Sequence, residues 1–235
     1  MRTGATILLK DGLCYQSYQW NIMRPLGSLQ NVIDSLEEYQ CDEIAIIRPV
    51  RQNDNREALN LDLMLLQQIN TMTPISFGGG IRVAEDLNLL TNLPVERLIF
   101  SSIFINKNTN LLNHACNLYG HQAIQCLLPV RYTHGNLDIF NCQQGTYIPL
   151  RDIDFDYINR HANEVILFDT QNEGLHDKFE KDIIKVMPLD KSKLIISGGI
   201  SHGVIKWAKE IKLACALIDN KVLHQEYSIK SYKHA

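Results

Sequence analysis

The chain carries the same glycine motif twice, half a chain length apart. Phe77-Gly78-Gly79-Gly80-Ile81 has a counterpart in Ser197-Gly198-Gly199-Ile200, and Ser101-Ser102 has a counterpart in Asn220-Lys221. Gly199 follows Gly80 by 119 residues, and Lys221 follows Ser102 by the same 119, in a chain of 235. This spacing predicts two structural halves of equal size and favours a closed, pseudo-symmetric architecture over an open sheet.

Short apolar runs alternate with longer segments of helical periodicity along the whole sequence. The predicted strands lie at 5–9, 43–48, 74–77, 97–100, 123–128, 164–168, 193–196 and 214–219. The predicted helices lie near 28–39, 57–70, 83–91, 109–119, 152–161, 177–187, 202–211 and 226–233. Strands alternating with helices indicate βα units and a parallel sheet, and apolar strands indicate burial on both faces. We therefore predict one α/β domain over residues 1–235, a (β/α)8 TIM barrel built of two half-barrels.

The longest irregular segment lies at about 132–150 and contains Gly135, Gly145 and Pro149. We predict that it forms a long loop after the fifth strand.

Composition narrows the function classes. A formal net charge of −3 gives no electrostatic reason to expect nucleic acid or a membrane surface as a partner. The apolar run near the N-terminus is too short for a signal peptide or a membrane span. The six cysteines and eight histidines show no metal-ligand spacing. We expect a cytoplasmic protein with reduced thiols, no metal and no cofactor.

The repeated glycines are typical of phosphate sites. Glycines at the carboxyl end of a barrel strand let backbone N–H groups approach an anion, and the following helix offers its positive N-terminus. One predicted phosphate site comprises Gly198, Gly199, Asn220 and Lys221, and its duplicate comprises Gly79, Gly80, Ser101 and Ser102. Ordinary tight turns explain one such motif, but two at matched spacing favour an elongated ligand with two phosphates.

The order of the motifs resembles a known family. Lys10-Asp11-Gly12, Asp42-Glu43, the FGGGIR run at 77–82, the ISGG run at 196–199 and the VLHQEYSI run at 222–229 are similar to the cyclase (HisF-like) subunit of imidazole glycerol phosphate synthase. An isomerase of the same pathway shares the barrel and the glycines, and the VLHQEYSI run favours the cyclase.

The sequence departs from the family pattern at two positions that the family uses for proton transfer. The resemblance implies one catalytic aspartate at the end of the first strand and another at the end of the fifth, where one carboxyl acts as base and the other as acid. These positions carry Leu8 and Pro129 here, and residues 122–137 contain no acid. Since neither side chain transfers protons, the sequence argues against both the cyclase and the isomerase reaction and leaves the catalytic residues unknown.

Other residues at the predicted carboxyl ends of the barrel strands are candidates for substrate binding. The second strand ends on Arg48 where the family has an aspartate, and Arg51 and Arg131 follow strands two and five. Guanidinium groups recognise phosphate or carboxylate through paired N–H donors, although loop arginines are also often only solvated. The resemblance assigns a substrate-binding position to Glu173.

The resemblance also predicts a charged ring at the opposite end of the barrel. Arg2, Glu43, Arg97 and Glu164 match four family positions through which ammonia passes from a partner glutaminase, and Glu96 matches a glutaminase contact. Charged residues at strand starts also stabilise barrels without any further role. Because all four side chains keep the charge sign of the family position, we predict that they form an ammonia gate.

Three functions follow from these observations. The first is a diverged synthase subunit that docks a HisH-like glutaminase, channels ammonia and holds a phosphorylated or nucleotide-sugar acceptor, as in cyclase-like paralogues that make acetamidino sugars for surface polysaccharides. The second is a cyclase of histidine biosynthesis in which Asp11, Asp169, Glu173 or Asp219 replaces the lost pair. The third is an inactive barrel that only activates its glutaminase.

Overall fold

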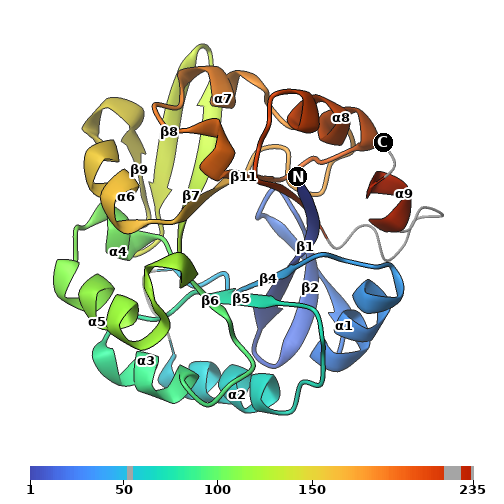
Figure 1. Ribbon diagram of the computed structural model, residues 1–235, viewed down its shortest axis with the longest axis vertical. Coiled ribbons are helices and arrows are strands. Elements are labelled where there is room, and N and C mark those ends of the chain that lie inside the picture. Colours follow the sequence, from blue (N-terminus) through green and yellow to red (C-terminus); the bar gives the residue numbers. More distant parts are fainter. Residues whose placement is uncertain (52–54, 220–228, 234–235) are drawn as a thin grey trace.

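The computed structural model describes residues 1–51, 55–219 and 229–233. Its centre is a closed ring of eight parallel strands, in which the pairing of β10 with β7 closes the circle (Figure 1). The ring contains β1 (Arg2–Lys10), β4 (Ile44–Ile47), β5 (Ile75–Gly78), β6 (Arg97–Phe100), β7 (Ile124–Thr133), β10 (Glu164–Asp169), β11 (Leu194–Ser197) and β12 (Cys215–Ile218). The predicted (β/α)8 barrel is therefore confirmed.

Helices surround the ring (Figure 1). They are α1 (Leu29–Glu38), α2 (Arg56–Gln67), α3 (Ala84–Leu90), α4 (Ser102–Ile105), α5 (Thr109–Tyr119), α6 (Phe155–His161), α7 (Asp182–Val186), α8 (His202–Glu210) and α9 (Ile229–Lys233). Short 3-10 turns occupy His121–Ala123, Leu150–Asp152 and Lys191–Lys193. The helix predicted at 177–187 is confined to α7, because the preceding residues form a loop over the end of β10. Among the described residues, no helix is long and apolar enough to cross a membrane.

The core is divided into two layers by the alternation of side chains along each strand. A large outer cluster packs strands against helices, and a separate inner cluster fills the barrel. The inner cluster consists of Leu8, Ala45, Ile47, Ile99, Leu127, Ile166, Phe168, Ile195, Cys215 and Leu217. All ten are apolar, as expected for the packed interior of an eight-stranded barrel.

Two antiparallel hairpins stand on the carboxyl ends of the strands, which we call the mouth. After β1, the chain forms β2 (Leu13–Tyr18) and β3 (Ile22–Gly27), which no sequence signal predicted. After the fifth barrel strand, it forms β8 (Asn136–Asn141) and β9 (Thr146–Pro149). The expectation of an irregular loop at 132–150 was wrong, because β7 continues to Thr133 and turns into this hairpin.

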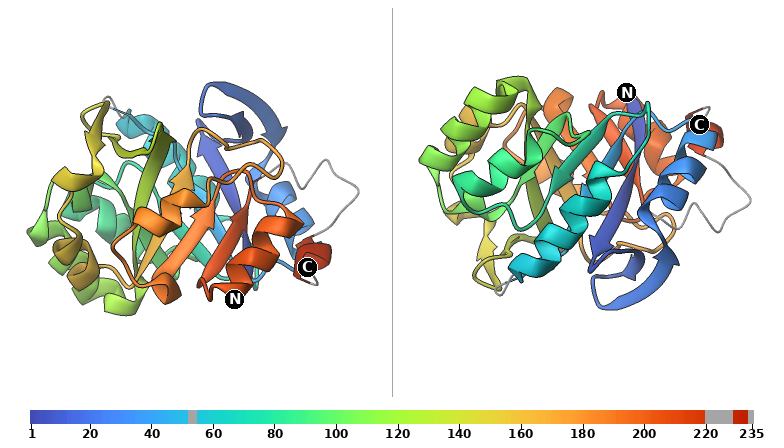
Figure 2. Two further views of the ribbon diagram at one scale, coloured as in Figure 1. Left: turned by 90° about the horizontal axis from the view of Figure 1, so that it is seen from above. Right: turned by 90° about the horizontal axis from the view of Figure 1, so that it is seen from below.

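The opposite end of the ring, which we call the base, holds Met1 and the strand starts. Figure 2 shows the base and the β2–β3 hairpin at opposite ends of the molecule, and Figure 1 looks onto the base. Side chains at even positions of β1 therefore run through the interior from Arg2 at the base to Leu8 at the mouth.

A buried ion pair joins the mouth elements. Asp62 of α2 is fully buried, and its Oδ2 accepts a hydrogen bond of 2.6 Å from Arg48 Nε at the end of β4. Asp62 Oδ1 accepts a 2.9 Å bond from the backbone N–H of Gly12, at the foot of the β2–β3 hairpin. Arg48 Nη1 in turn donates to the carbonyl of Gly79 at 3.1 Å. One carboxylate thus fixes a helix, a hairpin and a glycine turn.

We predict that Asp62→Ala lowers the free energy of unfolding by about 3–5 kcal/mol, because it leaves the buried Arg48 charge without this carboxylate. Asp62→Asn should fall between wild type and Asp62→Ala, since its amide oxygen still accepts from Gly12. Urea denaturation measures both, with the exposed Glu38→Ala of α1 as control. A loss under about 1 kcal/mol for Asp62→Ala would contradict this role.

Candidate functional site

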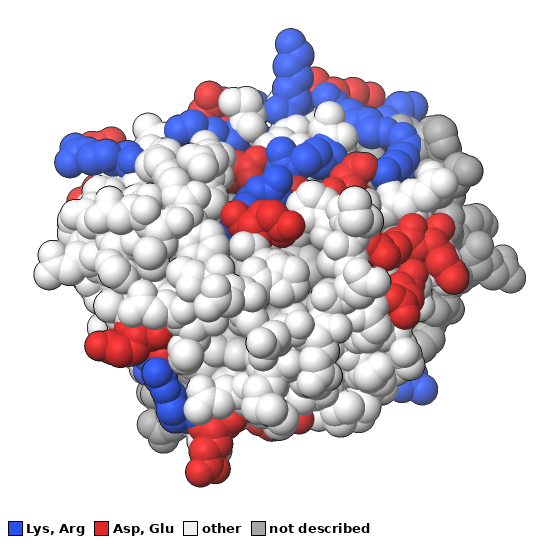
Figure 3. Space-filling model, turned by 60° about the horizontal axis from the view of Figure 1, so that its bottom comes forward, with Lys and Arg blue, Asp and Glu red and all other residues white. Residues whose placement is uncertain are grey.

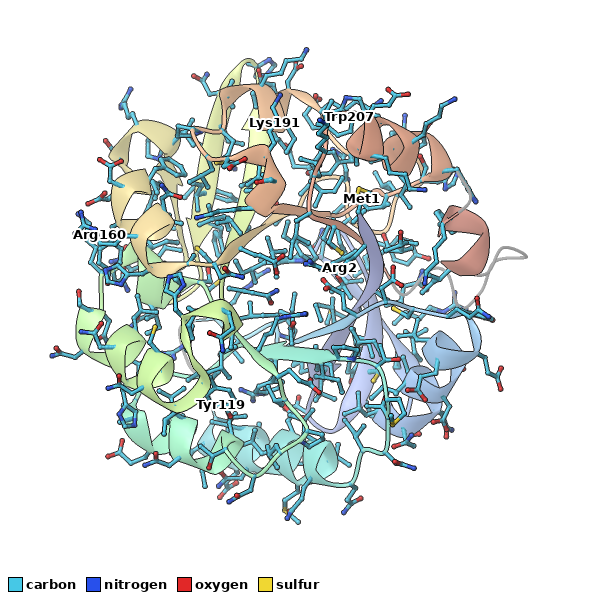
Figure 4. The ribbon with its side chains drawn as sticks, viewed as in Figure 1. Met1, Arg2, Tyr119, Arg160, Lys191 and Trp207 are labelled. Atoms are coloured by element: carbon cyan, nitrogen blue, oxygen red, sulfur yellow. The ribbon has the colours of Figure 1, made fainter. Side chains whose placement is uncertain are left out.

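The base carries a connected set of four charged side chains, all from the predicted ring. Arg2 Nε donates to Glu43 Oε2 at 2.6 Å, and Arg2 Nη2 donates to Glu164 Oε1 at 2.5 Å. Arg97 Nη1 lies 3.2 Å from the same oxygen of Glu43. The structure therefore brings Arg2, Glu43, Arg97 and Glu164 together, and Figure 4 shows Arg2 on the inner side of the strand ring.

The two carboxylates of this set are buried, whereas the arginines reach solvent. Glu43 is 3% exposed, and Glu164 also accepts a 3.0 Å bond from Gln125 Nε2 just inside the base. In Figure 3, basic and acidic side chains gather toward the top of the view, to which this turn moves the base, above a broad surface of uncharged residues. The exposed Glu96 accepts from the backbone N–H of Ile75 at 2.6 Å, beside the set.

The first glycine turn at the mouth approaches its neighbouring strand closely. Gly79 and Gly80 have φ angles of 101° and 86°, and a Cβ at Gly79 would lie 2.2 Å from the carbonyl oxygen of Arg48. A side chain is excluded there both by the backbone conformation and by this contact. The predicted partners Ser101 and Ser102 line one pocket with these two glycines.

The second glycine turn has the same geometry. Gly198 and Gly199 have φ angles of 95° and 70°, and a Cβ at Gly198 would lie 2.4 Å from the carbonyl oxygen of Asp169. The carbonyl of Gly199 accepts from the backbone N–H of Lys178 at 3.1 Å, so the loop after β10 packs against this turn. The predicted partners Asn220 and Lys221 lie outside the described residues.

The arginines at the mouth have different surroundings. Arg48 is buried against Asp62, although it borders the pocket of the first glycine turn. Arg51 borders the same pocket and lies over the rings of Trp20 and Phe140 at 6.0 and 5.5 Å. Arg131 does not line that pocket: it pairs with Asp138 at 2.8 Å on the β8 hairpin. Arg82 lines the pocket as well, a residue that sequence reasoning missed although it ends the FGGGIR run.

Glu173 lies beneath the β2–β3 hairpin and is 2% exposed. Its carboxylate accepts a 2.9 Å bond from Ser17 Oγ and a 3.3 Å bond from the backbone N–H of Trp20. Burial raises the pKa of Glu173 to about 7, the Ser17 hydrogen bond opposes this shift, and the nearby Asp219 charge adds to it. The group is therefore poised to exchange a proton near neutral pH.

Two of the other candidate acids, Asp11 and Asp169, are less suited to that role. Asp11 is exposed in the turn before β2. Burial raises the pKa of Asp169, but its oxygens accept from Asn172 Nδ2 at 2.7 Å and from the backbone N–H of Glu180 at 3.0 Å. Asp169 thus orders the loop after β10.

Comparison with known proteins decides the family. The sequence profile described as histidine biosynthesis protein matches residues 4–226. The chain belongs to this family. It is HisF-like, a diverged relative of the cyclase subunits, which confirms the resemblance seen in the motifs.

The relatives include both enzymes that the motifs suggested. The chain is 24% identical over 232 residues to the imidazole glycerol phosphate synthase subunit HisF of Flavobacterium johnsoniae, covering 96% of this chain and 91% of that protein. It is 23% identical over 201 residues to the putative imidazole glycerol phosphate synthase subunit hisF2 of Campylobacter jejuni, covering 83% and 78%. It is 27% identical over 171 residues to an imidazole-4-carboxamide isomerase of Buchnera aphidicola, covering 71% and 69%.

The structure places the two departures from the family pattern inside the barrel. Leu8 is 3% exposed and belongs to the apolar inner cluster. Pro129 lies within β7, opposite Phe168 of β10 in the parallel register. Both positions lie on the mouth side of the interior, but neither side chain carries a titratable group.

We predict that Glu173 makes stability depend on pH. Because the folded pKa of about 7 exceeds the ordinary value of 4.5, the folded state binds more protons between these values. The stabilisation is present below pH 4.5 and is lost as the pH rises to 7, by an amount on the order of 3 kcal/mol. Relative to Glu173→Gln, the wild type should therefore lose stability over this interval.

Urea denaturation of both proteins at pH 4.5, 5.5, 6.5 and 7.5 measures the difference. A difference in unfolding free energy that is the same at all four pH values would show that Glu173 does not titrate in this range.

Proposed function

We propose that the chain is the ammonia-accepting synthase subunit of a glutamine amidotransferase. A separate HisH-like glutaminase docks at the base, and ammonia crosses the barrel to an acceptor at the mouth. The observation that carries the proposal is the connected set of Arg2, Glu43, Arg97 and Glu164 above an apolar interior.

The apolar interior favours the passage of a neutral molecule over the passage of an ion. Transfer of an ion into an apolar environment costs far more than transfer of a small neutral molecule. Ammonia, unlike ammonium, therefore suits an interior lined by the ten apolar residues of the inner cluster. The base set fits an entrance, because Arg2 alone bridges two carboxylates from different strands and closes the ring with two hydrogen bonds.

The mouth supports a phosphorylated acceptor. Gly79, Gly80, Ser101 and Ser102 share a pocket with Arg51 and Arg82, so backbone donors, hydroxyls and guanidinium groups converge on one space. The finer form of the proposal is a nucleotide sugar whose acetamido group becomes an acetamidino group for a surface polysaccharide. That form rests on Leu8, the residue that cyclase-like paralogues of such pathways carry.

We predict that a HisH-like glutaminase from the same organism binds the chain and hydrolyses glutamine faster in the complex. Arg97→Ala and Glu164→Ala should each weaken this binding or stimulation by about tenfold or more, because each removes one ion pair from the set on which the glutaminase docks. Glutamate release and isothermal titration measure the two effects. Arg151→Ala, whose side chain is 85% exposed, is the matched control.

The same complex distinguishes the alternatives. With the ribonucleotide substrate and added ammonium, we expect no cyclase product, since Leu8 and Pro129 transfer no protons. Cyclase turnover would instead establish the histidine-biosynthetic enzyme. Stimulation of the glutaminase that survives Arg97→Ala and Glu164→Ala unchanged would leave only the inactive activator, and absence of binding would remove the proposal.

A further inference from the structure

A small cavity lies between the β2–β3 hairpin and the mouth end of the barrel. Thr6, Leu8, Gln16, Ser17, Glu173 and Asp219 contribute to its lining. Its volume is about 10 Å³, which is close to the minimum for one water-sized molecule. The cavity lies apart from the pocket that holds the first glycine turn, since none of these six residues lines both.

Several buried hydrogen-bond acceptors face this space, and one of them, Asp219 Oδ2, accepts a 3.1 Å bond from the backbone N–H of Gly174. Glu173 and Asp219 are 2% and 8% exposed, and Ser17 already directs its hydroxyl proton to Glu173 at 2.9 Å. Gln16 is 4% exposed, and its Oε1 is buried without a hydrogen-bond partner in the described part of the chain. A buried amide oxygen that accepts no bond costs about 1–3 kcal/mol, so the site favours an occupant that brings donors.

Ammonium fits this requirement better than water does. Ammonium has four N–H donors and no acceptor, whereas water has two donors and two lone pairs that need donors in return. Two buried carboxyl groups also stabilise a positive charge more than a neutral molecule.

The cavity adjoins the barrel interior. Leu8 and Phe168 line the cavity and belong to the inner cluster. Thr6 also lines it, and its Oγ1 lies 3.1 Å from Ser197 Oγ, across β12 on the next strand but one of the ring. A molecule that leaves the interior on this side of Leu8 therefore enters a space that Gln16 and Glu173 also line.

We propose that this cavity binds ammonia as ammonium at the mouth end of the conduit, with Glu173, Asp219 and Gln16 as its acceptors. The inference rests on the proposed function. On entry, the lone pair of ammonia takes the proton of the Glu173 carboxyl group: an O–H bond breaks, an N–H bond forms, and an ammonium–carboxylate pair results. The reverse transfer releases neutral ammonia toward the acceptor. Glu173 thereby stores ammonia in its protonated form and, on taking the proton back, releases the neutral nucleophile.

The test uses the full chain alone with ammonium chloride, methylammonium chloride and potassium chloride at equal ionic strength and pH 6.5. We expect ammonium to raise the melting temperature saturably, and ¹⁵N-labelled ammonium to give a bound NMR signal. Methylammonium should do neither, because the cavity has no room for a methyl group. Glu173→Gln and Gln16→Leu should weaken ammonium binding by about tenfold or more. Glu85→Gln, an exposed acid on α3, is the matched control and should bind as the wild type does.

Equal stabilisation by all three salts, or binding that is unchanged in Glu173→Gln, would overturn the assignment. The result is independent of the glutaminase experiment. A selective ammonium signal without glutaminase binding would support the ammonium site and contradict the proposed conduit. Glutaminase stimulation without an ammonium signal would support the conduit and contradict the ammonium site.

Discussion

The register of the closed parallel ring is the constraint on which the rest of the molecule depends. A strand shifted by one residue would exchange its inner and outer side chains. The observed register directs Arg2, Glu43, Arg97 and Glu164 to one end of a common interior, with Ala45, Ile99 and Ile166 beyond them and Leu8 and Phe168 at the mouth. The charged base and the apolar interior thus both follow from the alternation of side chains between the two faces of each strand.

The duplicated halves keep the backbone geometry but differ in what surrounds it. Each glycine turn approaches the end of the preceding strand, Arg48 in one half and Asp169 in the other. In the first half, Arg48 turns to Asp62 of α2, and the pocket above the glycines stays open and is lined by arginines. In the second half, Asp169 holds the loop that packs on Gly199. The two strand-end residues therefore have different partners, a helix in the first half and the loop after β10 in the second.

The sequence predicted the barrel because alternating βα units leave few other topologies, and the family resemblance predicted the base set by matching its four positions. Both hairpins escaped prediction, because Leu13–Tyr18 and Thr146–Pro149 carry mixed polar residues without clear alternation. Asp62 was missed for a different reason. An acid in an amphipathic helix ordinarily faces solvent, and only the tertiary contact with Arg48 shows that it faces inward. The position of Gln16 and Ser17 beside Glu173 could not be predicted either, because it depends on the β2–β3 hairpin lying over Glu173.

The altered mouth and the retained base are compatible because they act on different protonation states. A conduit needs neutral ammonia, since the inner cluster offers no charge to accompany an ion. The proposed cavity instead needs to retain its occupant, and the Glu173 carboxyl group, with a pKa of about 7, would do so by giving ammonia its proton. Leu8 and Pro129 stand where the family has two aspartates, so neither position offers a titratable group on the mouth side of the interior. If the proposed cavity holds ammonium, the proton transfer there falls to Glu173, because this carboxyl group lines the cavity and Leu8 beside it cannot take part.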